Sequence, residues 1–330
     1  MEKIKVGIIG VGKLGNFHCN ALSQMESVEL VGVHDVDALR AQEIAERYRC
    51  RAFAETAELI RESDCVGVIV PTTHHLATAK EVLQAGRPVF IEKPIAATLE
   101  EADEIVRLSE SLGIPVQVGH IERFNPAIRA LDGRLKDPLF IESHRLSPFD
   151  PRGTDIAVIL DLMIHDIDII LSLVQSPVTE IRASGVAIVS DEADIANARI
   201  EFASGCAANV TASRISQRKM RKMRIFQKDA YISIDFLLRL TEIFRLSDEP
   251  AASDGINLGM IDKGKYKRNI VYEKPPVPEQ DAMQAEWQSF LEAVRTGRTP
   301  VVTAKEARDA LAVAMEIREK VMAGAARVIG

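Results

Sequence analysis

The feature that most constrains the fold is a glycine pattern close to the start of the chain. Residues 10–15 read GVGKLG, which is G-x-G-x-x-G, and they directly follow the apolar run KVGIIG at 5–10. In a strand–turn–helix unit Gly10 permits the tight turn, Gly12 lets the backbone approach a pyrophosphate, and Gly15 lets helix and strand pack closely. The helix that follows presents N–H groups and a positive dipole end to phosphates. Three glycines alone can also form a simple turn, so this interpretation needs support elsewhere.

A carboxylate at the end of the second predicted strand gives that support. The run VELVGVH at 28–34 is followed by Asp35, which lies 20 residues after Gly15. At this distance an acid accepts hydrogen bonds from the adenosine ribose of NAD, and no arginine follows at once as it does in many NADP sites. Asp35 could instead begin the helix at 38–48, but Asp37 fills that role better. The pattern favours NAD over NADP.

The rest of the first third alternates strand and helix. Apolar runs at 65–70, 88–92 and 115–119 have the length and β-branched content of buried parallel strands. Amphipathic stretches at 75–86 and 99–113 lie between them and end in glycine. This alternation predicts an α/β fold that begins with a doubly wound parallel sheet of the Rossmann type.

The rhythm changes beyond about residue 121, where we place the domain boundary. Segments such as 140–147, 196–202 and 206–214 alternate like half-exposed antiparallel strands, and two helices are predicted at 281–296 and 304–322. The first domain is therefore expected at 1–121 and a second domain, of the α+β kind, at 122–330.

Composition excludes several classes of protein. The net charge is −7, which argues against nucleic acid as the main partner. The four cysteines form no C-x-x-C pair, so neither a disulfide framework nor a zinc site is indicated, and no metal is expected. No apolar run approaches the ~20 residues that span a bilayer, and the opening MEKIKVGIIG leaves no room for a signal peptide. A cytoplasmic protein is expected.

The tetrapeptide IEKP at 91–94 follows the fifth predicted strand, at the sheet edge where ligands bind in such folds. The ammonium of Lys93 could stabilise charge on a substrate oxygen or relay a proton. Pro94 holds the residue before it in an extended backbone, and a cis Lys-Pro bond is possible. The alternative is a surface ion pair between Glu92 and Lys93.

The octapeptide DLMIHDID at 161–168 places ionisable groups in an apolar helix. On a regular helix Asp161, His165 and Asp168 share one stripe. A carboxylate one turn from an imidazole orients the ring and stabilises its cationic form, which suits a general base for a hydroxyl group. The alternative is a helix start whose aspartates serve the dipole and whose histidine is satisfied locally.

The chain resembles the Gfo/Idh/MocA family of nicotinamide-dependent sugar oxidoreductases, essentially end to end. The resemblance rests on GVGKLG, Asp35, PTTHH at 71–75, EKP at 92–94 and D-x-x-x-H at 161–165. It implies a second domain with a large, mostly antiparallel open sheet, often used for oligomerisation, so a homodimer or homotetramer is expected. It implies that Lys93 and His165 are catalytic and that Asp161 supports the histidine. The cofactor residues it implies are Gly10, Gly12, Lys13, Leu14, Gly15, Asp35, Pro71, Thr72, His75, Glu92, Lys93 and Pro94.

A narrower resemblance is to bacterial UDP-N-acetylglucosamine 3-dehydrogenases. It rests on GHIERFNPA at 119–127, HRLSPFDPR at 144–152, DLMIHDIDI at 161–169 and the segments within 196–214. Family members that act on free polyols often carry glycines before the catalytic-helix aspartate, where this chain has AVIL at 157–160.

Several arginine side chains lie in segments that flank the predicted cleft, which is consistent with an anionic substrate. A guanidinium group is well shaped for bidentate contacts with phosphate. The candidate substrate residues are Arg123, Asn125, Arg145, Arg152 and Asp168. The basic run RKMRKMR at 218–224 is either a second phosphate contact or a solvated strand edge, and it is not assigned to the site.

The resulting hypothesis is an NAD-dependent oxidation of a sugar hydroxyl, at C3 of UDP-N-acetylglucosamine. The alternatives within enzymes are UDP-N-acetylglucosaminuronic acid, another nucleotide sugar, or an unactivated sugar or polyol. From a different class, a regulator that senses dinucleotide without chemistry is also possible on this fold.

Overall fold

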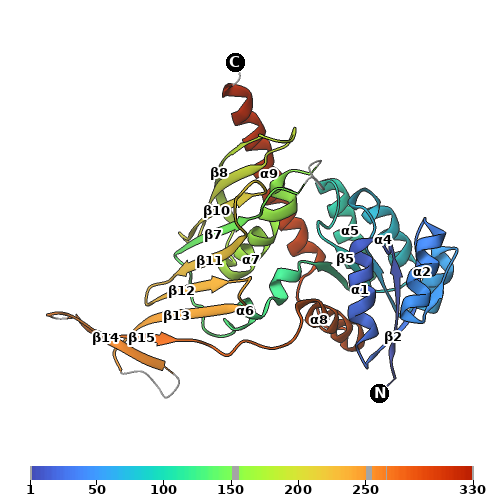
Figure 1. Ribbon diagram of the computed structural model, residues 1–330, viewed down its shortest axis with the longest axis horizontal. Coiled ribbons are helices and arrows are strands. Elements are labelled where there is room, and N and C mark those ends of the chain that lie inside the picture. Colours follow the sequence, from blue (N-terminus) through green and yellow to red (C-terminus); the bar gives the residue numbers. More distant parts are fainter. Residues whose placement is uncertain (1, 151–155, 250–254, 265, 329–330) are drawn as a thin grey trace. The chain divides into compact units, whose positions relative to one another are not determined.

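The computed structural model describes residues 2–150, 156–249, 255–264 and 266–328, and the chain forms two compact units (Figure 1). Unit 1 contains Met1–Phe124 and Gln280–Leu311, and unit 2 contains Asn125–Glu279 and Ala312–Gly330. The sequence prediction assigned 280–311 to the second domain, whereas the structure groups it with unit 1. Amphipathic periodicity shows that a helix has a buried face but not which core buries it.

Unit 1 is built on a parallel sheet, as predicted. Within residues 4–119 it has six strands in the order β3-β2-β1-β4-β5-β6. The strands are β1 (Ile4–Ile9), β2 (Val28–His34), β3 (Arg51–Ala52), β4 (Cys65–Val68), β5 (Val89–Glu92) and β6 (Val116–Gly119). The order changes direction between β1 and β4, and ligands bind beyond the carboxyl ends of strands at such a switch point.

The helices of unit 1 begin and end at the signals that the sequence carries. Asp37 accepts hydrogen bonds from two backbone N–H groups at the start of α2, and Gly113, with φ +64°, ends α5. The helices are α1 (Lys13–Ser23), α2 (Ala38–Tyr48), α3 (Thr56–Glu62), η1 (Thr72–His74), α4 (His75–Gln84), α5 (Leu99–Leu112), η2 (Ile121–Phe124) and α8 (Ala282–Thr296). Trp287, Phe290 and Leu291 of α8 join the core cluster around β1, which explains why this late segment belongs to unit 1.

Unit 2 is built on a large, mostly antiparallel sheet, as predicted. Among the described residues it has nine strands in the order β14-β15-β13-β12-β11-β7-β10-β9-β8, in which β7 and β10 pair in parallel. The strands are β7 (Phe140–Leu146), β8 (Val178–Val186), β9 (Ile195–Phe202), β10 (Ala207–Ser213), β11 (Met220–Phe226), β12 (Ala230–Asp235), β13 (Leu240–Ser247), β14 (Gly255–Lys263) and β15 (Tyr266–Glu273). Alternate residues of β9 are buried, so one face of the sheet faces a core.

The helices of unit 2 include the predicted catalytic segment. They are α6 (Pro126–Arg129), the π-helical turn η3 (Ile159–Met163), α7 (Ile164–Val174) and the later part of α9 (Ala304–Val328). The sequence predicted one regular α-helix over 161–168, whereas its first residues belong to the π turn. Within the described residues, no helix has the length and apolar character that crossing a bilayer requires.

Candidate functional site

The glycine loop after β1 has the shape that a pyrophosphate needs. Gly10 has φ +89°, and a Cβ atom added there would lie 2.5 Å from the Ile69 carbonyl oxygen. A Cβ atom on Gly15 would lie 2.1 Å from the Gly10 oxygen, whereas one on Gly12 would meet, among the described atoms, only Arg40 Nη1 at 3.8 Å. Two glycines are therefore needed for backbone packing, and the space above Gly12 is open to a ligand.

The amino terminus of α1 is available to that ligand. Its N-cap residue is Gly12, and no side chain of the described chain caps the helix there. The first N–H groups of an α-helix have no partner within the helix, so an anion can accept their hydrogen bonds. The loop and helix start thus fit the phosphates of a dinucleotide.

Asp35 lies beside the same loop. One carboxylate oxygen accepts a 2.8 Å hydrogen bond from the Val11 N–H, and the other accepts a 3.0 Å bond from the Asp37 N–H. A carboxylate offers about four lone-pair sites. The remaining sites can accept the hydroxyl groups of a ribose, so Asp35 both fixes the loop and fits the adenosine end of NAD.

His75 connects two loops at the carboxyl edge of the sheet. The side chain is buried, with Nδ1 2.9 Å from the Pro94 oxygen and Nε2 3.0 Å from the Val70 oxygen. Burial lowers the pKa of His75, although the two carbonyl groups oppose this effect. Pro71 is exposed and Thr72 half-buried at the same edge. His75 therefore holds the loop after β4 against the loop after β5, and its contact with a cofactor remains a prediction.

The EKP motif continues from β5, and its Lys93–Pro94 bond is cis. The side chain of Glu92 is only 12% exposed, and both of its carboxylate oxygens have contacts. One carboxylate oxygen lies 2.8 Å from His18 Nε2, and the other accepts a 3.0 Å bond from the Lys93 N–H. Burial opposes ionisation of Glu92, but the bond from His18 and the charge of Lys93 outweigh it and lower the pKa of Glu92.

His120 was not predicted as a site residue, although it follows β6 at this same edge. The side chain is 1% exposed. Burial first, and then the positive charges of Lys93 and Arg123, lower the pKa of His120 to about 3. The imidazole is therefore neutral near pH 7. The sequence signal was the same one that indicated Lys93, namely an ionisable residue directly after a strand.

Two candidate substrate residues have contacts within their own units. Arg123 donates a 3.0 Å hydrogen bond to Glu306. Asn125 accepts the Ala127 N–H at 3.0 Å and so caps α6. A contact of either side chain with substrate remains a prediction.

The segment DLMIHDID does not present one uniform stripe. Asp161 lies in the π turn and is half-buried, whereas His165 and Asp168 lie in α7, the first half-buried and the second buried. Asp166, which the sequence did not single out, is 1% exposed and pairs with Arg145 through bonds of 3.0 and 2.8 Å. Arg145 is itself 2% exposed, so its described contact holds α7 in place. Its role toward a substrate phosphate remains a prediction.

Other sequence candidates are placed as follows. Arg152 lies outside the described residues. The basic run at 218–224 extends into β11, where Lys222 pairs with Asp235 and Arg224 with Glu142, as expected for a solvated strand. Within the described parts of the chain, no group of three or more His, Cys, Asp or Glu side chains could hold a metal ion.

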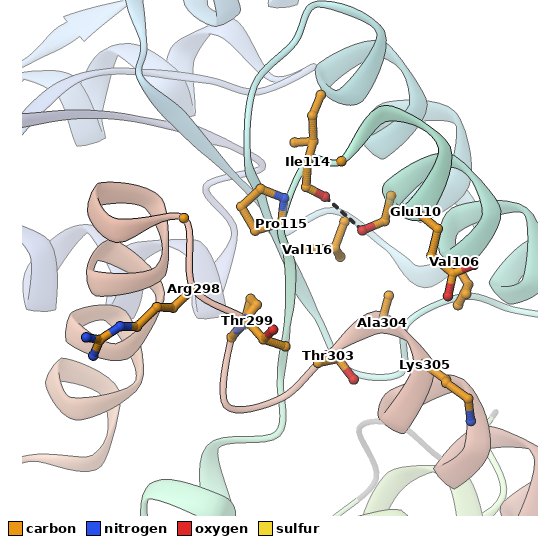
Figure 2. A pocket seen from close by; sticks show the side chains of 14 residues that line it. Val106, Glu110, Ile114, Pro115, Val116, Arg298, Thr299, Thr303, Ala304 and Lys305 are labelled. Carbon is orange, nitrogen blue, oxygen red and sulfur yellow. Dashed lines mark hydrogen bonds between the residues drawn. The ribbon is translucent and has the colours of Figure 1, made fainter.

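A separate cavity of about 390 Å³ lies at the opposite edge of the parallel sheet (Figure 2). Its walls come from the end of α5, the amino end of β6 and the loop at 297–303. Figure 2 shows Thr299 and Thr303 beside this space. The hydroxyl of Ser109, which also lines the cavity, donates a 2.8 Å hydrogen bond to the Ile114 oxygen. The predicted site residues follow the carboxyl ends of strands, so this cavity is not the predicted site.

Comparison with known proteins identifies the family. Residues 4–120 match the model of the Gfo/Idh/MocA oxidoreductase family with an NAD-binding Rossmann fold, and residues 129–233 match a Gfo/Idh/MocA C-terminal domain. The chain is 37% identical over 325 residues to UDP-N-acetylglucosamine 3-dehydrogenase of Acidithiobacillus ferrooxidans, covering 98% of this chain and 99% of that protein. The chain belongs to the Gfo/Idh/MocA family. The predicted family, α/β fold, NAD cofactor and oxidoreductase class are confirmed.

Two solved structures of dehydrogenases have a similar fold. The crystal structure of the Acidithiobacillus ferrooxidans dehydrogenase superposes with a TM-score of 0.86 and covers 98% of this chain and 99% of that one. The scyllo-inositol dehydrogenase of Lactobacillus casei, solved with NAD(H) and scyllo-inositol, has a TM-score of 0.76 at 19% identity, covering 98% of each chain. The second likeness shows the fold alone.

Proposed function

We propose that this Gfo/Idh/MocA oxidoreductase oxidises the C3 hydroxyl of UDP-N-acetylglucosamine to the 3-keto sugar, with NAD⁺ as the hydride acceptor. The observation that carries the proposal is the 37% identity to a UDP-N-acetylglucosamine 3-dehydrogenase over 98% of the chain, which spans both units. Relatives that act on inositol match less well: an inositol 2-dehydrogenase of Acidothermus cellulolyticus is 33% identical over 55% of this chain.

The first unit would hold the cofactor. Lys13 and Leu14 begin α1, and Gly12 leaves open space for the pyrophosphate at that helix terminus. Asp35 would accept the ribose hydroxyl groups, while Pro71, Thr72, His75 and the EKP residues would surround the nicotinamide end. When bound, the nicotinamide supplies the acceptor for the hydride that leaves the sugar carbon.

The catalytic roles follow from the chemistry of the side chains. His165 would take the proton of the C3 hydroxyl, and Asp161 would support the resulting imidazolium. The ammonium of Lys93 would stabilise the negative charge that develops on the C3 oxygen as its proton leaves, before hydride transfer turns that oxygen into a carbonyl. Lys93 belongs to unit 1 and His165 to unit 2, and their joint action on one sugar is part of the proposal.

The diphosphate and sugar would be held by the remaining candidates. Guanidinium groups of Arg123, Arg145 and Arg152 suit phosphate oxygens. Asn125 and Asp168 would hydrogen-bond sugar hydroxyl groups.

A side-by-side assay tests the substrate. The purified protein is incubated with NAD⁺ and, in separate reactions, UDP-N-acetylglucosamine, UDP-N-acetylglucosaminuronic acid, free N-acetylglucosamine and myo-inositol. NADH absorbance is expected to grow fastest with UDP-N-acetylglucosamine, and its product should have lost two hydrogen atoms by mass spectrometry. If another sugar is oxidised faster, that sugar replaces UDP-N-acetylglucosamine as the proposed substrate. If no sugar in a broad panel is oxidised, a dinucleotide-sensing regulator is favoured.

Substitution of the two catalytic candidates tests the mechanism. Lys93→Ala and His165→Ala should each lower kcat by about 10²–10⁴-fold, the usual contribution of general acid–base groups, while NAD⁺ binding persists. Lys80→Ala is the matched control, because Lys80 lies on α4, where it forms a half-buried ion pair with Glu104 and is none of the predicted site residues. Wild-type turnover in either alanine variant rejects its assignment.

We also propose that the protein is cytoplasmic and forms a homo-oligomer. Its subunits would associate through the open face of the sheet in unit 2, which has nine strands among the described residues. A row of neighbouring aromatic rings crosses that face, with centroids 5.1–5.9 Å apart. Its members are Phe140, Phe226, Tyr231, Phe244 and Tyr272. Light scattering after gel filtration should give a dimer or tetramer, and Phe244→Asp should shift it toward the monomer; a monomeric wild type rejects this proposal.

A further inference from the structure

Two buried side chains and a partly buried carboxylate, from distant parts of the sequence, form one hydrogen-bonded chain in unit 1. The indole Nε1–H of Trp287 on α8 donates a 2.9 Å bond to His18 Nδ1 on α1. His18 Nε2 lies 2.8 Å from an oxygen of Glu92 at the end of β5. Trp287 and His18 are fully buried, and the side chain of Glu92 is 12% exposed. Figure 1 labels the three elements that meet here.

The direction of these bonds is set by the chemistry of the indole. Tryptophan can only donate, so His18 Nδ1 must accept. A neutral imidazole that accepts at Nδ1 carries its proton on Nε2, and this N–H donates to Glu92. The other oxygen of Glu92 accepts the Lys93 N–H at 3.0 Å. The chain therefore runs from Trp287 through His18 to Glu92 and ends on the backbone of Lys93.

The packing leaves these groups little freedom to rearrange. The Phe90 ring stacks on Trp287 with centroids 4.6 Å apart, and His18 contacts both rings edge-on. On the adjacent strand, a Cβ atom added to Gly119 would lie 3.1 Å from the Glu92 carboxylate. Because Gly119 has no side chain, there is room for the Glu92 carboxylate, and the two aromatic rings restrict rotation of the His18 ring.

We propose that Trp287 and His18 are positioning residues that aim Glu92 and thereby fix the backbone of Lys93. This inference rests on the proposed catalytic role of Lys93. It assigns a role in the active site to α8, which lies nearly two hundred residues beyond β5 in the sequence. A reacting group that is displaced by about an ångström can lose ~100-fold in rate, so a remote hydrogen bond that sets its backbone matters for turnover.

Two core variants distinguish an effect on the position of Lys93 from a general loss of core packing. Trp287→Phe removes one N–H donor and keeps an aromatic ring, whereas Phe290→Leu trims a ring of the same cluster that has no polar atom. Trp287→Phe should lower kcat by ~10–100-fold with the KM for NAD⁺ nearly unchanged. Phe290→Leu should lower the thermal midpoint and keep kcat near wild type. Equal losses of kcat in both variants, or none in Trp287→Phe, overturn the proposal.

A rescue pair tests the imidazole in the middle of the chain. His18→Phe keeps a planar ring without polar atoms and should lose turnover as Trp287→Phe does. The amide of His18→Gln offers one acceptor and donors in similar positions, so it should recover most of the lost kcat. A glutamine variant that is as slow as the phenylalanine variant overturns the hydrogen-bond role.

One spectroscopic readout does not depend on turnover. The chain has a single tryptophan, so ¹⁵N-labelled protein shows one indole N–H resonance. That resonance should exchange slowly with D₂O and shift in His18→Phe, but stay in place in Lys80→Ala. If no sugar is turned over but the resonance behaves in this way, the proposed function fails while the hydrogen-bonded chain stands. An indole resonance that His18→Phe leaves unchanged overturns the chain itself.

Discussion

Two glycines of the loop at 10–15 differ in what surrounds them, and this difference yields a prediction. A methyl group at position 15 would collide with the Gly10 carbonyl oxygen, whereas one at position 12 would meet no close neighbour among the described atoms. Gly15→Ala should therefore lower the free energy of unfolding by about 1–3 kcal/mol, the usual cost of overpacking. Gly12→Ala should leave stability within about 0.5 kcal/mol and weaken NAD⁺ binding by ~10-fold or more, because its methyl group enters the phosphate space.

Urea unfolding and NAD⁺ titration of the two variants measure these effects. Tight NAD⁺ binding by Gly12→Ala would show that the pyrophosphate lies elsewhere. The comparison is informative because both variants add the same single methyl group.

The function of a single residue could be predicted from the sequence where it depends on the distance of that residue from a recognised motif. Asp35 could be found by counting from Gly15, because strand and helix lengths set that distance. The partners of His18 could not be found, because they come from α8 and β5 and depend on how three elements pack. Arg145 was predicted as a phosphate contact from its guanidinium group and its segment beside the predicted cleft. Its burial with Ile141 and Ser143 on the inward face of β7 could not be predicted in this way, because it depends on how the strand packs.

At the scale of elements, the ion pair between Arg145 and Asp166 joins β7 to α7 and predicts a clear double-variant result. Both side chains are almost completely buried and share two hydrogen bonds. Arg145→Met leaves the Asp166 charge buried without this partner and should lower the free energy of unfolding by about 3–5 kcal/mol. Adding Asp166→Leu should recover most of that loss, because an apolar pair of similar volume needs no counter-charge.

Urea unfolding of the two single variants and the double variant gives the coupling energy. A double variant as unstable as the sum of the two single variants would mean that the pair acts independently. Turnover of a stable double variant would then report whether the ion pair also places His165, its sequence neighbour.

Helices and strands could be predicted where the spacing of apolar residues along the chain reflects which faces are buried. The parallel strands read as continuous apolar runs, and the antiparallel strands read as alternation, because the first are covered on both faces and the second on one. The π turn at Ile159–Met163 could not be predicted, because one extra residue in a turn changes backbone hydrogen bonds without changing composition. Strand order in unit 2 also depends on pairings that no local pattern specifies.

At the scale of the whole molecule, the division into units was the hardest feature to predict. The chain leaves the Rossmann unit after Phe124 and returns to it at Gln280. Helix α8 has the same amphipathic pattern that it would have in either core. The packing of Trp287 and Phe290 against Phe90 and the core around β1 places it in unit 1.

The stability of the whole molecule should depend on pH through its buried histidines. Burial and nearby positive charge lower the pKa of His120 from 6.5 to about 3, and burial also lowers the pKa of His75. In the unfolded chain both imidazoles bind a proton below about pH 6.5, whereas in the folded protein each binds its proton only at lower pH, His120 at about pH 3. The unfolded state then binds more protons, so stability falls as the pH drops from about 6.5 toward 3.

Each such histidine contributes a slope of up to about 1.4 kcal/mol per pH unit. The free energy of unfolding in urea should therefore decrease between pH 6.5 and 5, with no contribution from these groups between pH 7.5 and 8.5. His120→Leu removes one of the protons taken up on unfolding, so its slope below pH 6.5 should be shallower by about that amount, whatever its stability at pH 8. A slope identical to wild type would mean that the pKa of His120 is not lowered in the folded protein.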